Sequence, residues 1–159
     1  MKFVAWFMVF LLLASVAGVG YLYATAQVVV EAMGVKSFEA QDQQAYFDDL
    51  KQRLENETVL GTVYQNTQLG EASSYVFLTY TIRLRNDCLI TADMIEVQIV
   101  PTEYDILQLG NTDVKALLPH TKGDLTGTVL AKRDTHAVRQ IIITYYIWGI
   151  PFTLKETYG

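Results

Sequence analysis

Residues 75–85 read YVFLTYTIRLR, and the alternation in this run decides the fold that we expect. Tyr80, Ile82 and Leu84 fall on one face of an extended chain, while threonine and arginine side chains between them face the other way. A period of two residues is typical of a strand with one face on a core and the other in water. The run therefore predicts a half-buried β-strand.

Other short runs rich in strand-forming residues lie on both sides of this strand in the sequence. Turn-prone residues separate them, and the runs cover residues 59–64, 94–100, 125–131 and 138–154. The last run is apolar on both faces at IIITYYIW (141–148) until Gly149 and Pro151 interrupt it, which predicts a central strand followed by a bend. About seven strands at this spacing predict a mainly β fold, a single antiparallel β-sandwich over residues 58–159.

A more polar segment before the first run predicts a short amphipathic helix. Ser37 can cap its N-terminus, and the helix reaches about Glu55. Four apolar side chains fall largely on one face of this helix: Phe38, Phe47, Leu50 and Leu54. Residues 31–57 are therefore expected to form either a helix packed on the sandwich or a helical stalk that leads away from a membrane.

The N-terminal segment, residues 1–30, predicts a transmembrane helix. The stretch from Phe3 to Tyr23 is almost wholly apolar and carries no charge, and about 20 such residues span the ~30 Å core of a bilayer as a helix. Lys2 precedes it, which favours a cytoplasmic N-terminus and places the following domain outside. The residues expected within the membrane or at its surfaces are Phe3, Trp6, Phe10, Leu12, Gly18, Tyr21 and Tyr23.

A cleaved signal peptide is the alternative interpretation of this segment. Ala24-Thr25-Ala26 before Gln27 satisfies the small-x-small rule for a cleavage site. Signal cores usually run about 7–15 apolar residues, whereas this one is longer and continues into Val28-Val29-Val30. A retained single-pass anchor is therefore favoured, and both interpretations export the domain.

Charge and residue usage exclude several function classes. The chain has 17 acidic and 12 basic residues, a net charge of -5, so the counterion-release gain of nucleic-acid binding is not expected. Cys88 stands alone, which rules out an intramolecular disulfide and favours packing beside a strand. The only histidines, His120 and His136, lie in expected loops without ligand spacing, so neither a metal nor another cofactor is predicted.

Catalysis is not expected either. No nucleophile motif, phosphate-binding glycine loop or facing pair of carboxylates is present in the sequence. One group of aromatic residues near the C-terminus is a candidate interaction surface, although such residues in a final strand more often fill a core: Tyr145, Tyr146, Trp148 and Phe152.

The second half of the chain carries a family resemblance. A hydrophobic strand ends in the turn Leu84-Arg85-Asn86, a strand pair and a proline-containing turn follow, and a closing strand contains Tyr145 and Gly149. This order resembles the LEA14-like, water-stress and hypersensitive-response β-sandwich family, or related immunoglobulin- and fibronectin-like modules, although the family's usual Asn-Pro is Asn86-Asp87 here. The resemblance implies a non-enzymatic sandwich that contacts lipids, proteins or other envelope components, with no catalytic residues.

Three functions remain open from the sequence. The first is a membrane-anchored extracytoplasmic binding or interaction module, which would contact the lipid bilayer through its N-terminal helix and an envelope protein through its domain. The second is a structural subunit of a membrane complex. The third is a secreted domain that results from cleavage near Ala26.

Overall fold

The computed structural model describes residues 2–65, 68–110 and 115–159. Its elements, in chain order, are α1 (Lys2–Ala24), β1 (Val28–Glu39), a 3-10 turn (Ala40–Gln43), α2 (Gln44–Glu55), β2 (Gly61–Val63), a second 3-10 turn (Ala72–Ser74), β3 (Tyr75–Asn86), β4 (Ala92–Ile99), β5 (Asp105–Leu109), β6 (Lys115–Leu117), β7 (Lys122–Lys132), β8 (Arg139–Ile147) and β9 (Ile150–Tyr158).

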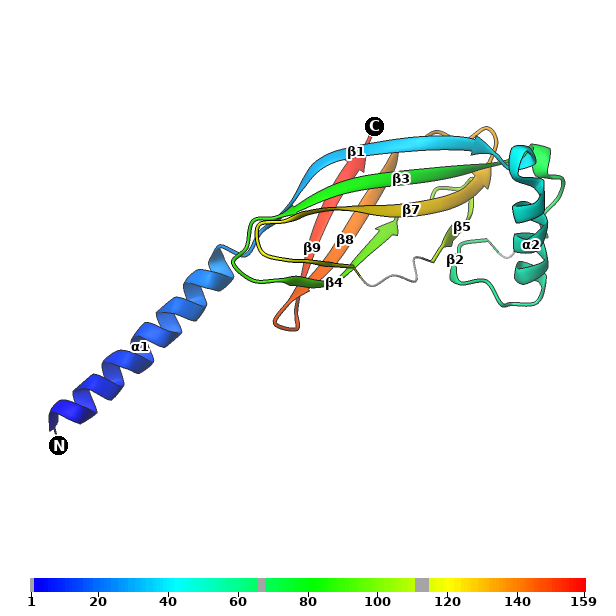
Figure 1. Cartoon of the computed structure of the whole chain (residues 1–159). Coiled ribbons are helices and arrows are strands. Elements are labelled where there is room, and N and C mark those ends of the chain that lie inside the picture. Colours follow the sequence, from blue (N-terminus) through cyan, green and yellow to red (C-terminus); the bar gives the residue numbers. More distant parts are fainter. Residues whose placement is uncertain (1, 66–67, 111–114) are drawn as a thin grey trace.

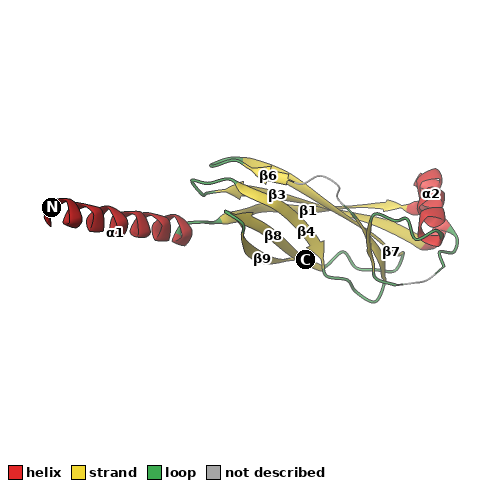
Figure 2. Ribbon diagram, turned by 90° about the horizontal axis from the view of Figure 1, so that it is seen from below, coloured by secondary structure: helices red, strands yellow, loops and turns green. Residues whose placement is uncertain are grey.

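The strands form two antiparallel sheets that face each other, as Figures 1 and 2 show. One sheet has the order β1-β3-β7-β5-β2 and the other the order β6-β4-β8-β9. The alternation in β3 is confirmed, because Tyr80, Ile82 and Leu84 are fully buried between the sheets. Ile95 and Ile99 of β4 face the same core. The predicted mainly β fold is therefore correct.

The prediction of helix over residues 31–39 is wrong. Val28–Glu39 forms strand β1, which pairs antiparallel with β3 from Val28 opposite Asn86 to Glu39 opposite Val76. Without β1, the outer edge of the long strand β3 would leave a row of backbone groups unpaired. The sandwich therefore begins at Val28, inside the segments that were expected to be anchor and stalk.

The amphipathic helix itself is confirmed over a shorter range, Gln44–Glu55, and it packs on the sandwich. Phe47 and Leu50 are buried in a second apolar cluster with Phe77, Leu107 and other residues of β3, β5 and β7. This burial selects the packed helix over the stalk, because a stalk would leave both side chains in water.

The final run forms a hairpin, β8–β9, where a bend was expected. β8 lies inside its sheet between β4 and β9, as predicted for a central strand. Trp148 and Gly149 make the connection with φ values of +51° and +76°. Two successive left-handed residues are typical of the type I′ turn, whose twist matches that of the paired strands.

The two helices lie at opposite ends of the sandwich. α1 leaves one end as an isolated apolar helix, and none of its residues is buried. α2 covers the other end, as Figure 1 shows. We call these the proximal and the distal end.

Candidate binding cleft at the distal end

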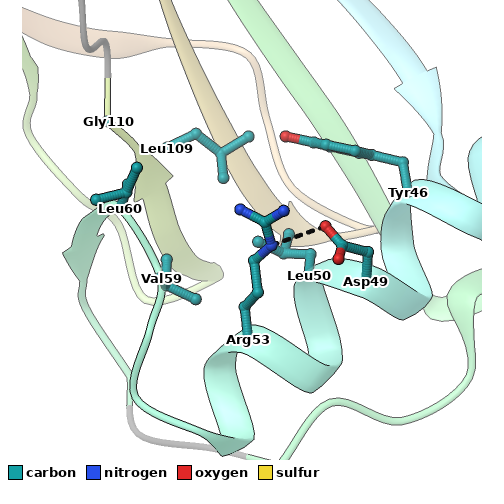
Figure 3. A pocket seen from close by; sticks show the side chains of 8 residues that line it. All are labelled: Tyr46, Asp49, Leu50, Arg53, Val59, Leu60, Leu109 and Gly110. Carbon is teal, nitrogen blue, oxygen red and sulfur yellow. Dashed lines mark ion pairs between the residues drawn. The ribbon is translucent and has the colours of Figure 1, made fainter.

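A hollow of about 190 Å³ lies at the distal end between α2 and the edge of the five-stranded sheet. Figure 3 shows the eight residues that line it, which we call the α2–β2 cleft: Tyr46, Asp49, Leu50, Arg53, Val59, Leu60, Leu109 and Gly110. A neighbouring hollow of about 410 Å³ shares Val59 and adds Leu54, Glu57, Val63 and Tyr64. Together they form a groove beside β2.

Aromatic packing fixes α2 against β3 of the five-stranded sheet. The ring of Phe47 lies 5.4 Å from that of Tyr75, and the ring of Tyr46 lies 5.5 Å from that of Phe77. Tilted ring pairs at such distances add to the free energy gained from apolar burial. The helix is therefore held in a fixed position, with Asp49 and Arg53 on the side that faces the cleft (Figure 3).

A helix-terminating turn carries the chain from α2 to the cleft's opposite wall. The backbone N–H of Thr58 donates to Arg53 O at 2.9 Å, and that of Glu57 donates to Leu54 O at 3.2 Å. These bonds make a Schellman motif in which Glu57, with φ +55°, occupies the left-handed position usually taken by glycine. The motif reverses the chain so that Val59 and Leu60 face back toward α2.

Two glycines allow the backbones of the opposite wall to approach closely. A Cβ added to Gly61 would lie 2.2 Å from the carbonyl oxygen of Gln108, and one added to Gly110 would lie 3.1 Å from that of Leu60. Gly110 N–H also donates to Leu60 O at 2.8 Å. This tight pairing of β2 with β5 presents Leu60 at the rim with 63% of its surface exposed.

The chemistry of the cleft is an apolar floor with a polar rim. Leu50, Val59 and Leu109 supply the floor. At the rim, the guanidinium of Arg53 lies 2.8 Å from the carboxylate of Asp49 in a solvent-exposed ion pair, drawn as a dashed line in Figure 3. Nothing in this set resembles a nucleophile with its base, and the arrangement suits the binding of an apolar side chain flanked by a hydrogen-bonding group.

A partly buried polar bridge, which includes Tyr64 of the groove's lining, joins the two sheets. The hydroxyl of Tyr64 lies 2.7 Å from Ile99 O and 2.9 Å from Gln108 Oε1, and Gln108 Nε2 donates to Val97 O at 2.8 Å. Gln108 Oε1 also accepts from the N–H of Ile99. The bridge joins β5 of one sheet to β4 of the other, so the wall of the groove cannot slide along the sandwich.

Burial of two tyrosines predicts a loss of stability at alkaline pH. Burial raises the pKa of Tyr64 to about 12, with the negative charge of Asp105 adding to the shift, and burial likewise raises the pKa of Tyr80 to about 12. An unfolded tyrosine ionises near pH 10, so between about pH 10 and 12 only the unfolded chain releases these protons. The contribution of these two tyrosines to the free energy of unfolding is therefore expected to be constant below about pH 9.5 and to fall from pH 10 to 12.

Urea titrations of the full chain in a non-ionic detergent, followed by circular dichroism at pH 9 and 11, measure this fall. Between the two pH values, the free energy of unfolding is expected to fall less in the Tyr80→Phe variant than in the parent chain. Equal stability at both pH values would contradict the assignment.

The structure separates the aromatic residues that the sequence grouped as an interaction surface. Tyr145 is buried in the main core, and its ring stacks on that of Phe152 at 5.4 Å. Tyr146 is half-buried, and Trp148 projects from the β8–β9 turn with 58% of its surface exposed. The four side chains therefore do not share one surface.

The other residues considered in the sequence analysis lie outside the cleft. Cys88 is buried, as expected for a packed side chain, and burial raises the pKa of its thiol. His120 and His136 are exposed, and over the described part of the chain no three His, Cys, Asp or Glu side chains gather into a group that could hold a metal ion. The residues expected to span a membrane all lie in α1 with exposed side chains.

No family model and no curated protein matches this chain. The α2–β2 cleft was not identified from the sequence, where only the apolar face of this helix was considered. The signals that could have marked it are Gly61, which begins β2, and Gly110, which follows β5, at the point where the two strands approach closely.

Proposed function

We propose that the chain is a single-pass, membrane-anchored binding module, in which α1 spans the bilayer and the extracytoplasmic sandwich holds the α2–β2 cleft toward a partner protein. α1 has 23 residues, about 34 Å at 1.5 Å per residue, which matches the ~30 Å hydrocarbon core of a bilayer. Its mean hydropathy reaches 2.3, and its side chains lie outside the packed core. Lys2, ahead of the apolar stretch, supports a cytoplasmic N-terminus.

One observation carries the proposal: α2 and β2, which border the cleft, lie at the end of the sandwich opposite to α1 (Figure 1). A bilayer around α1 would leave the distal end free and directed away from the membrane. A protein that holds a recognition surface out to a partner requires this arrangement.

A protein segment fits the groove better than other partners do. The apolar floor takes a side chain, and Arg53 and Asp49 offer polar contacts at its rim. β2 lies at the edge of its sheet, where an added strand of a partner could pair with it. The acidic chain repels nucleic acid. We assign no catalytic step and no cofactor to the site, and the family resemblance stays a prediction.

Site-specific photo-crosslinking in cells tests the cleft. A photoreactive residue at Leu60 is expected to capture one defined protein, whereas the same residue at Val138, another exposed apolar position outside the cleft, should not. Arg53→Glu is expected to weaken the Leu60 adduct about ten-fold, because it places a second carboxylate at the rim. Arg83→Glu, on an outer sheet face, should leave it unchanged. Identical adducts from Leu60 and Val138, or no adduct, would remove the cleft from the proposal.

The N-terminus of the mature protein tests the anchor separately. An intact Met1 in the membrane fraction is expected. A chain that starts at Gln27 in soluble material would instead establish a secreted domain, and it would also exclude an anchored structural subunit of a complex.

A further inference from the structure

Exposed apolar side chains gather at the proximal end of the sandwich. Four large ones come from three connections, and we call them the proximal patch: Leu89 between β3 and β4, Leu118 between β6 and β7, and Trp148 and Ile150 at the β8–β9 turn. Their exposed fractions run from 41% for Ile150 to 62% for Leu118. Both views show these connections at the end from which α1 leaves (Figures 1 and 2).

The connections are held in place by buried groups. Asn86 is fully buried, and its Nδ2 donates to Ile90 O and Leu117 O, each at 2.9 Å, and to Leu118 O at 3.2 Å. Its Oδ1 accepts from the N–H of Cys88 at 2.9 Å. One side chain therefore fixes the connections that carry Leu89 and Leu118, so their exposure is a property of the folded structure.

Trp148 occupies a position that its residue type does not favour. A φ of +51° in a two-residue turn suits Asn, Asp or Gly, and a bulky side chain there is strained. The turn nevertheless places an indole at its tip with more than half of its surface exposed. Tryptophan is the residue type that is enriched at the interface of bilayer and water.

The junction between α1 and the sandwich fixes the depth of the patch. Gln27 O accepts from the N–H of Asp87 at 3.0 Å, which ties the short linker after α1 to the connection that bears Leu89. The ring of Tyr23, in the last turn of α1, lies 5.4 Å from the ring of Phe152, two residues after Ile150. Two residues of strand span about 7 Å, and the interfacial layer on each side of a bilayer core is about as thick. The patch therefore lies near the level at which α1 leaves the hydrocarbon.

We propose that the proximal patch inserts into the interfacial layer of the bilayer around α1, so that the sandwich is seated on the membrane at a fixed angle. This inference rests on the proposed anchoring through α1. Four charged residues near the junction pair with one another, since Glu31 lies 2.8 Å from Lys122 and 3.0 Å from Arg85, and Arg85 also contacts Asp87. Asp93, opposite Tyr146 in the β4–β8 pair, is exposed at the same end. The occupant is therefore a lipid surface bound by apolar burial, and zwitterionic phosphatidylcholine suffices for it.

Depth-dependent fluorescence quenching in the full chain tests the patch. The chain has two tryptophans, Trp6 and Trp148, so Trp6→Phe reports on the patch alone and Trp148→Phe reports on α1 alone. Each variant is reconstituted into phosphatidylcholine vesicles that carry a spin-labelled lipid, with the label near the headgroup or near the end of the acyl chain. A Tyr46→Trp reporter at the distal cleft, in a chain without the other two tryptophans, is the matched control.

The headgroup-proximal label is expected to quench Trp148 at least two-fold more than it quenches the Tyr46→Trp reporter. Leu89→Glu combined with Leu118→Glu should reduce the quenching of Trp148, because it lifts the patch out of the lipid. If Trp6 is quenched and Trp148 is not, the patch faces water or a protein. The insertion of the patch is then wrong, while the anchoring through α1 is retained. If neither is quenched and the chain does not float with the vesicles, both the anchoring through α1 and the insertion of the patch are wrong.

Discussion

Replacing Arg139 with methionine is expected to lower the free energy of unfolding by about 3–5 kcal/mol, because Asp105 would keep a buried charge without its partner. Arg139 Nε donates to Asp105 Oδ2 at 2.9 Å and Nη2 donates to Oδ1 at 2.7 Å. Side-chain exposure is 1% for the arginine and 0% for the aspartate. This bidentate pair joins β8 of one sheet to β5 of the other, so its loss weakens the packing between the two sheets.

The same arginine also satisfies backbone groups at the distal end. Its Nη1 donates to Val138 O at 2.7 Å and to His136 O, and its Nη2 donates to Thr135 Oγ1 at 2.7 Å. Each of these partly buried carbonyls that loses its donor adds to the cost of the substitution. Arg139→Lys is therefore expected to recover only part of the loss, since an ammonium cannot reproduce the planar fork.

The chain offers a matched control in the Arg83–Asp124 pair. That pair is also bidentate, at 2.8 and 2.9 Å, but its side chains are 55% and 44% exposed. Arg83→Met is expected to cost at most about 1 kcal/mol, because water replaces the lost partner. Urea unfolding of the full chain in a non-ionic detergent measures both variants. Equal costs for Arg83→Met and Arg139→Met would show that burial does not control the effect.

A double variant separates the stranded charge from the lost contact. Asp105→Leu combined with Arg139→Met removes both charges, and it is expected to be more stable than Arg139→Met alone. Some loss relative to the parent chain is still expected, because Thr102 N–H, at 2.8 Å from Asp105 Oδ2, loses its acceptor. A double variant less stable than the single one would contradict the assignment.

This buried pair also explains what the sequence did and did not predict of the fold. Alternation identified β3 and its buried face, because apolar and polar side chains there follow the two faces of the sheet. The strand-like run 94–100 likewise matches β4. β5 escaped notice because Asp105 and Gln108 look like surface residues, although both are buried and hydrogen-bonded. From sequence alone, a polar side chain such as Asp105 is predicted to be exposed, because its buried partner Arg139 lies far away in the chain.

Strand β1 was missed for a different reason. It is an edge strand with most residues exposed or half-buried, and Glu31, Gly34 and Lys36 interrupt any apolar period. Its stability comes from pairing with β3, which lies more than forty residues away in sequence for most of the paired positions. The α2–β2 cleft likewise depends on the pairing of β2 with β5, so the helix and the strand-like run 59–64 were predictable locally, whereas the cleft between them was not.

Asn86→Ala is expected to lower the free energy of unfolding by about 2–4 kcal/mol, because it removes one side chain that satisfies several buried groups. The N–H of Cys88 loses its acceptor, and Ile90 O and Leu117 O lose their donor. Each polar group left unsatisfied in a buried position costs about 1–3 kcal/mol. The backbone bonds of residue 86, such as its N–H to Thr121 O at 2.9 Å, remain, so β3 itself still forms.

Two further variants show which atoms of Asn86 matter. Asn86→Asp keeps an acceptor for Cys88 N–H but turns an anionic oxygen toward the carbonyl oxygens of Ile90 and Leu117, so it is expected to be at least as destabilising as Asn86→Ala. Asn56→Ala, at an exposed asparagine after α2, should cost less than about 0.5 kcal/mol. Urea unfolding in detergent compares the three variants.

Amide hydrogen exchange of the folded Asn86→Ala chain locates the damage. Exchange is expected to quicken in residues 87–91 and 118–121, the two connections that Asn86 joins, and to stay unchanged in α2 at the other end of the sandwich. The same loosening should weaken the quenching of Trp148 by headgroup-labelled lipid, because the proximal patch would no longer hold Leu89 and Leu118 at one level. Unchanged exchange in both connections, with stability equal to that of Asn56→Ala, would mean that the proximal end is organised without Asn86, and its rigidity would then have to come from strand pairing alone.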